Sequence, residues 1–218
     1  MEQSIALLAG TAAALGFVHT ITGPDHYLPF VVMAQTRKWG NVKTMWIVFL
    51  CGLGHVLSSV VIGVIGIAAG IAVGKLELIE GMRGSLASWL LFGAGVAYTI
   101  WAVVHRLIKP QHAHTHLTDE QKARRTMTFW VLFTIFVFGP CEPLIPILMY
   151  PAAEHNLMAI VIVALVFSVT TIVTMLSVTM LLIKGFSFVK LHTLEKYQHI
   201  LAGATITACG AGIIFLGL

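Results

Sequence analysis

Residues 19–30, "HTITGPDHYLPF", place two histidines and an aspartate beside a Gly-Pro pair inside an otherwise apolar region. Pro24 has no amide hydrogen to donate and Gly23 relaxes the backbone, so we expect a helix to break here. Inside a membrane, backbone groups left unpaired by a break are tolerated only where they line an enclosed or watery cavity. The stretch therefore predicts a broken first helix beside a polar cavity.

The composition around this stretch is that of an integral membrane protein. Of 218 residues, 58% are hydrophobic and 10% are charged, and the mean hydropathy is +0.92. A spanning helix needs about 20 apolar residues. Six apolar runs predict an all-α fold of six transmembrane helices in the lipid bilayer: 4–34, 44–73, 84–107, 127–150, 157–183 and 198–217. No basic residue precedes the first run, so we interpret it as a helix and not as a signal peptide.

The basic residues indicate an orientation in the membrane. Eleven of the 13 lie in alternate loops, namely Arg37, Lys38, Lys43, Arg106, Lys109, Lys122, Arg124, Arg125, Lys184, Lys190 and Lys196. By the positive-inside rule these loops face the cytoplasm, so both termini are predicted outside a plasma (inner) membrane. The basic residues are spread over short loops without an aromatic-basic surface, and nucleic-acid binding is therefore not expected.

The two halves of the chain resemble each other in one segment. "GPDHYLPFVVMA" at 23–34 aligns with "GPCEPLIPILMY" at 139–150. We predict two inverted three-helix repeats, 1–107 and 126–218, joined by a cytoplasmic linker at 108–125, with helices 1 and 4 broken at Gly-Pro. Transporters built this way bind substrate near the bilayer midplane, where the broken helices meet. The alternative is a chance similarity between two proline-kinked helices, since proline is frequent in membrane helices.

Ionisable residues inside the apolar runs define the candidate site. A charge in the membrane is costly and needs a partner, and imidazole with carboxylate suits a divalent transition metal. The predicted metal ligands are Asp25, His26, His55 and Glu142, with His19 and Cys141 assisting. The alternatives are a structural hydrogen-bond network for the histidines and Asp25, and simple packing for Cys141.

Three further histidines alternate in the linker, at His112, His114 and His116. In an extended chain their rings lie on one side and can share a metal ion, which suggests capture or sensing on the cytoplasmic side. A solvated stretch with histidines at these positions by chance is the alternative.

Other classes of function fit the residues less well. Cys51, Cys141 and Cys209 form no CxxC pair, and the repeat partner of Cys141 is Asp25, so thiol-disulfide electron transfer is disfavoured. Export of a sulfur anion meets two carboxylates that would repel it. Neither HExxH nor GxSxG occurs, so no enzyme is expected, and no prosthetic group.

The motifs "HTITGPDH", "LGHVLSS" and "GPCEPL" together resemble the nickel/cobalt permease superfamily, including its urease-accessory-type permeases. "GPCEPL" is also similar to the "PC" motif of related sulfite exporters and thiol-redox membrane proteins. The resemblance implies transport of nickel or cobalt. The imidazole ligands also suit zinc or copper as cargo, and assembly into a homo-oligomer is left open. The alternative functions are a membrane thiol-disulfide electron carrier and a sulfur-anion exporter.

Overall fold

The computed structural model describes residues 2–108, 119–139, 141, 143–188 and 197–216, and this part of the chain is helical throughout its regular structure. The elements are α1 Glu2–Thr22, the 3-10 turn η1 Pro24–His26, α2 Leu28–Thr36, α3 Asn41–Ala68, α4 Val73–Ile108, α5 Asp119–Phe138, α6 Leu144–Ala153, α7 Leu157–Phe188 and α8 Gln198–Leu216.

Five helices of the described part are long and apolar enough to cross a membrane: α1, α3, α4, α7 and α8. The predicted fourth span, 127–150, consists of the shorter apolar segments Phe129–Phe138 and Leu144–Ala153. Its division coincides with the Gly-Pro pair at 139–140, as the missing amide hydrogen of proline leads one to expect. Large apolar side chains are exposed along the outer faces of the helices, as lipid contact requires.

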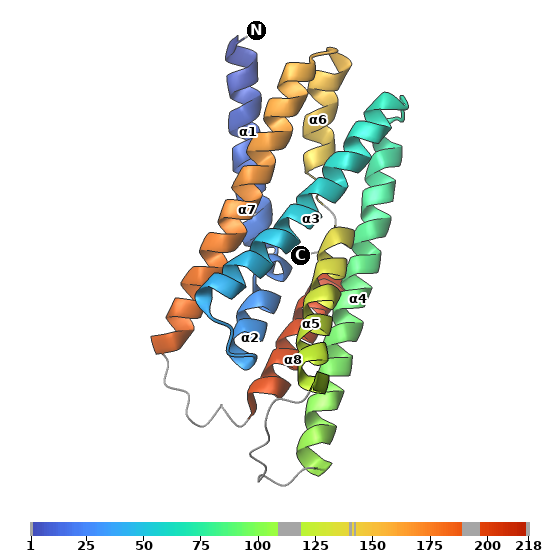
Figure 1. The fold of residues 1–218 in the computed structure, drawn as a ribbon. Helices are drawn as coiled ribbons and strands as arrows, with labels where there is room; N and C mark the ends of the chain where they lie inside the picture. Colours follow the sequence, from blue (N-terminus) through green and yellow to red (C-terminus); the bar gives the residue numbers. More distant parts are fainter. Residues whose placement is uncertain (1, 109–118, 140, 142, 189–196, 217–218) are drawn as a thin grey trace.

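The first Gly-Pro pair also interrupts a helix. The amide of Gly23 still donates to the carbonyl of His19, 3.1 Å away, but Gly23 itself has φ −90° and ψ 94°, an extended conformation. Pro24 then begins the 3-10 turn, and α2 starts at Leu28. A long helix, a break and a short helix therefore follow one another twice in the chain, in α1–η1–α2 and in α5–α6 (Figure 1).

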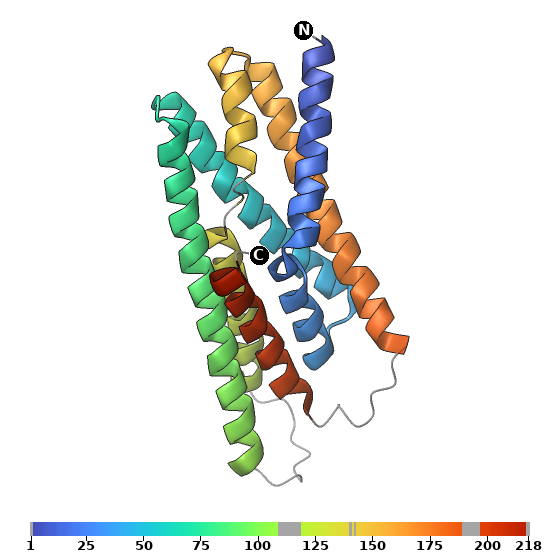
Figure 2. The same ribbon diagram turned by 180° about the vertical axis from the view of Figure 1, so that it is seen from behind.

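The helices pack in two regions, one at each end of the molecule. Helix α1 packs mainly on α7, with α6 beside them, while α4 packs on α8 and α3 contacts both α5 and α7 (Figures 1 and 2). One buried apolar cluster includes Phe30, Cys51, Phe136, Met175 and Cys209, and the other includes Val56, Cys141, Leu144, Leu148 and Phe167. Helices α3 and α7 contribute to both clusters, and the two breaks lie between them.

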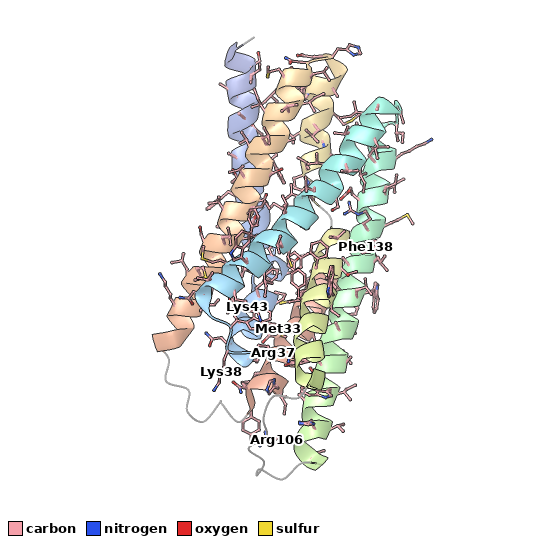
Figure 3. The ribbon with its side chains drawn as sticks, viewed as in Figure 1. Met33, Arg37, Lys38, Lys43, Arg106 and Phe138 are labelled. Carbon is pink, nitrogen blue, oxygen red and sulfur yellow. The ribbon has the colours of Figure 1, made fainter. Side chains whose placement is uncertain are left out.

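Basic side chains gather in the half of the molecule away from the N-terminus. Figure 3 labels Arg37, Lys38, Lys43 and Arg106 there. They come from the α2–α3 connection, the start of α3 and the last turn of α4. These four of the eleven basic residues used to predict an orientation therefore lie in the same half of the molecule.

Helices α4 and α8 approach closely because glycines of each helix face the backbone of the other helix. A Cβ atom at Gly95 would overlap the backbone of Thr207, and one at Gly203 would overlap Thr99. Gly93, two residues before Gly95, is exposed and has no atom within 4 Å of a Cβ placed on it.

This packing gives a matched stability prediction. Gly95→Ala should lower the free energy of unfolding by about 1–3 kcal/mol, because the helices must move apart to admit the methyl group. Gly93→Ala is the control and should leave thermal unfolding in detergent unchanged or slightly raised. Equal melting temperatures for the two variants would contradict the close α4–α8 contact.

Candidate functional site

Three histidines from separate elements meet at the first break. His19 lies in the last turn of α1, His26 in η1 and His55 in α3, and one ring nitrogen from each lies within 4.8 Å of the others. Seven residues of regular helix would separate His19 and His26 by about 10 Å along the axis. Their ring centroids are 4.7 Å apart, and those of His26 and His55 are 5.0 Å apart. The break therefore assembles the cluster.

Hydrogen bonds orient two of the imidazoles. His26 Nδ1 lies 3.1 Å from the carbonyl oxygen of Gly23 and 3.2 Å from Asp25 Oδ1, while His55 Nδ1 lies 3.2 Å from the carbonyl oxygen of Phe136. A carbonyl can only accept, so Nδ1 carries the proton in both rings. In the neutral ring Nε2 then holds the lone pair. The hydrogen bonds made by Nδ1 of His26 and His55 therefore fix the direction of the Nε2 lone pair on the opposite side of each ring.

The glycine of each Gly-Pro pair makes room for one of these imidazoles. A Cβ atom at residue 23 would lie 2.5 Å from His26 Nδ1, and one at residue 139 would lie 2.9 Å from His55 Nδ1. A larger residue at either position would displace the ring. The two breaks therefore serve the same histidine cluster.

Cys141 lies against the third histidine. Its sulfur is 2.9 Å from His55 Nε2, and the residue is completely buried. Because His55 Nδ1 already donates its proton, the Cys141 thiol is the donor and His55 Nε2 the acceptor. The arrangement is a thiol–imidazole pair at the second break.

A buried acid holds the backbone of Cys141 in place. Glu80 of α4 is 0% exposed, and its Oε2 lies 3.2 Å from the Cys141 amide nitrogen and 3.0 Å from Ser59 Oγ. Ser59 Oγ also lies 3.3 Å from the same amide. This amide would otherwise be unpaired, because it precedes the first turn of α6.

Arg83 satisfies the other side of the break. It forms an ion pair with Glu80 one turn before it, and its Nη2 donates to the carbonyl oxygen of Val137 at 2.7 Å and of Gly139 at 3.4 Å. Nη2 also donates to Ser58 Oγ at 2.7 Å. The end of α5 leaves such carbonyls without helical partners, so the ion pair caps both half-helices at once.

The sequence interpretation did not identify this ion pair as part of the site. Glu80 and Arg83 fall between the predicted apolar runs 44–73 and 84–107, whereas they lie inside α4, which begins at Val73. Their spacing of three residues, which places them on one helix face, was the available signal.

A cavity of about 620 Å³ adjoins the cluster. Its lining includes His19, Asp25, His26, His55, Gly139 and Pro143. Residues from both breaks therefore border one space, and the opening stretch predicted the cavity beside the first break.

The structure brings together most of the predicted site residues. His19, His26 and His55 form the cluster, Asp25 contacts His26, and Cys141 contacts His55. Glu142 lies outside the described residues, as do His112, His114 and His116 of the linker. Metal coordination by any of the six predicted ligands stays a prediction.

This geometry defines a multi-pass membrane protein with a thiol and an imidazole at a broken helix. Residues 26–214 match the family described as the cytochrome c biogenesis protein transmembrane region, and the chain belongs to this family. No curated protein and no solved structure matches the chain significantly.

The family assignment corrects the sequence interpretation in two respects. The family is not the nickel/cobalt permease superfamily, so that resemblance was misleading, and the prediction of a divalent-metal transporter is wrong. The error came from short motifs around His26 and His55, which any membrane protein with buried histidines at a helix break can share. The family match covers the helical core and agrees with the thiol-redox relatives suggested by "GPCEPL".

The network around the second break gives a stability prediction. Glu80→Gln removes one partner and leaves the Arg83 cation buried without its counter-charge, so it should cost about 3–5 kcal/mol of stability. Glu77→Gln, an exposed site on the same helix, is the control and should have little effect. Thermal unfolding in detergent measures both. A Glu80→Gln protein as stable as the control would show that the ion pair does not hold the break.

Proposed function

We propose that the chain is a membrane thiol–disulfide exchange protein in which Cys141 is the reacting thiol. The observation that carries the proposal is the 2.9 Å contact between Cys141 Sγ and His55 Nε2. A neighbouring base activates a thiol by removing its proton, and the thiolate is the nucleophile. The family of cytochrome c biogenesis membrane regions supports the same class of chemistry.

The exchange proceeds in two balanced steps. His55 Nε2 accepts the Cys141 proton, the sulfur attacks one sulfur of a substrate disulfide, and the other sulfur leaves as a thiolate that takes up a proton. A mixed disulfide with Cys141 remains. A thiol from a reducing dithiol then attacks it and releases the first substrate as a thiol, and closure of the dithiol to a disulfide regenerates Cys141. Two electrons pass from the dithiol to the disulfide.

The mixed disulfide is resolved by the reducing dithiol and not by a second cysteine of this chain. Cys51 and Cys209 are buried in the other apolar cluster, with Phe30 and Met175, whereas Cys141 packs with Leu144 and Phe167. The position equivalent to Cys141 in the first half is Asp25. An internal disulfide with Cys141 is therefore not part of the proposal.

Access to the thiol comes from the cavity. Cys141 is completely buried, while His55, Gly139 and Pro143 on either side of it line the cavity. Rotation of the His55 ring away from Cys141 would open the thiol to a substrate in this space. The backbone contacts of Glu80 and Ser59 keep the sulfur in position during that movement.

We also propose that the fold consists of two inverted repeats, with the linker 108–125 in the cytoplasm and both termini outside. The paired order of long helix, break and short helix supports the repeat. The basic residues in the half of the molecule away from the N-terminus support the orientation (Figure 3).

Thiol exchange can be measured in proteoliposomes. The lumen holds a membrane-impermeant chromogenic disulfide and the outside a membrane-impermeant dithiol. The wild-type chain should speed reduction of the disulfide, and Cys141→Ser should lower the rate to that of protein-free liposomes, because no sulfur remains to form the mixed disulfide.

The control carries both Cys51→Ala and Cys209→Ala and should retain the wild-type rate, since neither sulfur takes part. An unchanged rate in Cys141→Ser, or a wild-type rate equal to that of protein-free liposomes, would contradict the proposed function.

Orientation is tested by single cysteines placed in a chain without its native ones. Lys38 and Ala69 are exposed and lie just beyond opposite ends of α3. An impermeant thiol reagent applied to intact cells should label Ala69→Cys at once and Lys38→Cys only after permeabilisation. The opposite pattern would reverse the orientation.

A further inference from the structure

The three-histidine cluster holds lone pairs that the thiol chemistry does not use. His19 Nε2 and His26 Nε2 are buried and have no hydrogen-bond partner among the described residues. His26 is 3% exposed as a residue. Buried polar atoms of this kind are rare in folded proteins and call for an unseen water or ion.

We propose that His19, His26 and His55 bind a resident d10 transition-metal ion, Zn²⁺ or Cu⁺, through one ring nitrogen each. The ion belongs to the protein and is not transported. The proposal goes beyond the thiol exchange described above, and its binding step does not depend on that function. Imidazole nitrogen is a preferred ligand for both ions, and a three-histidine set leaves one coordination position open.

The hydrogen bonds behind the rings are those that metal-binding histidines require. Such a histidine almost always donates its other ring N–H to a carboxylate or a backbone carbonyl, which fixes the tautomer and the ring orientation. His26 Nδ1 donates to Asp25 and Gly23, and His55 Nδ1 donates to the Phe136 carbonyl. Asp25 also supplies a negative charge next to the ligand set, which offsets the charge of the ion.

The distances place the three nitrogens within reach of one ion. They lie within 4.8 Å of one another, whereas ligands of a tetrahedral zinc ion with bonds of about 2.0 Å lie about 3.3 Å apart. Rotation of the rings about their side-chain bonds closes this difference. The extended residue Gly23 separates the last turn of α1, which carries His19, from the 3-10 turn that carries His26, so one continuous helix does not hold the two histidines.

A metal ion on His55 would couple this site to Cys141. The lone pair of His55 Nε2 accepts the Cys141 proton in the structure, and a lone pair bound to a metal cannot accept a proton. Occupancy of the site by an ion bound through this nitrogen therefore removes the base from the thiol. The bound metal would therefore inhibit the reaction of the Cys141 thiol.

Metal binding is measured on purified chain in detergent, with His112, His114 and His116 replaced by Ala and with a tag that lacks histidine. After chelation and desalting, Zn²⁺ alone and Cu⁺ alone are titrated and bound metal is counted by mass spectrometry. One ion per chain is expected. His26→Gln should show no binding at metal concentrations near the Kd of the parent chain. Asp25→Asn should weaken the affinity by about 10–100-fold.

His105→Gln is the matched control, since His105 is exposed on α4 and outside the cluster, and it should bind as the parent does. No saturable binding in the parent, or equal binding in His26→Gln, would overturn the proposal and leave buried water as the partner of these nitrogens. The binding measurement uses no thiol substrate, so the two proposals can fail separately. A chain that binds zinc but does not catalyse disulfide exchange would contradict the proposed function and leave the metal site standing.

The coupling is tested by alkylation of Cys141 in the Cys51→Ala, Cys209→Ala chain with a membrane-permeant maleimide. Saturating Zn²⁺ should slow the reaction by about 100-fold, the low end of what a positioned base contributes. An unchanged rate with one zinc ion bound would show that the ion does not bind through His55 Nε2 and would overturn the three-histidine site.

Discussion

The buried ion pair between Glu80 and Arg83 is the interaction on which the rest of the site depends. Both side chains come from α4, and together they pair the carbonyl groups that end α5 and the amide that precedes α6. An ion pair in an apolar environment is favoured only when further hydrogen bonds satisfy its remaining groups. Here the unpaired backbone groups of the break supply the further hydrogen bonds. The ion pair and the break would each be unfavourable alone, and each stabilises the other.

The first break is held in a different way. The contacts around Gly23 are local ones made by the 3-10 turn and by His26. The second break is fixed by tertiary contacts, whereas the first depends on its own side chains. Similar Gly-Pro pairs thus give one rigidly held thiol and one histidine cluster with uncommitted nitrogens.

The sequence predicted the parts of the structure that follow from the cost of burial. The helical membrane fold, the two breaks and the meeting of His19, His26 and His55 all follow from apolar runs interrupted by proline and costly side chains. The sequence did not predict that Glu80 and Arg83 are buried, because charges at the edge of an apolar run look like the start of a loop. It also misassigned the family, because the motifs at the breaks describe a local environment and not the chemistry performed there.

The division of 127–150 into two short apolar segments has a consequence for how the protein is made. Phe129–Phe138 and Leu144–Ala153 contain ten residues each, about 15 Å of helix, and neither alone crosses a hydrocarbon core of about 30 Å. Helix α4 precedes them in the chain, so Glu80 and Arg83 emerge from the ribosome before the segment whose backbone they cap. Synthesis from the N-terminus delivers the partners of the break to the bilayer ahead of the break itself.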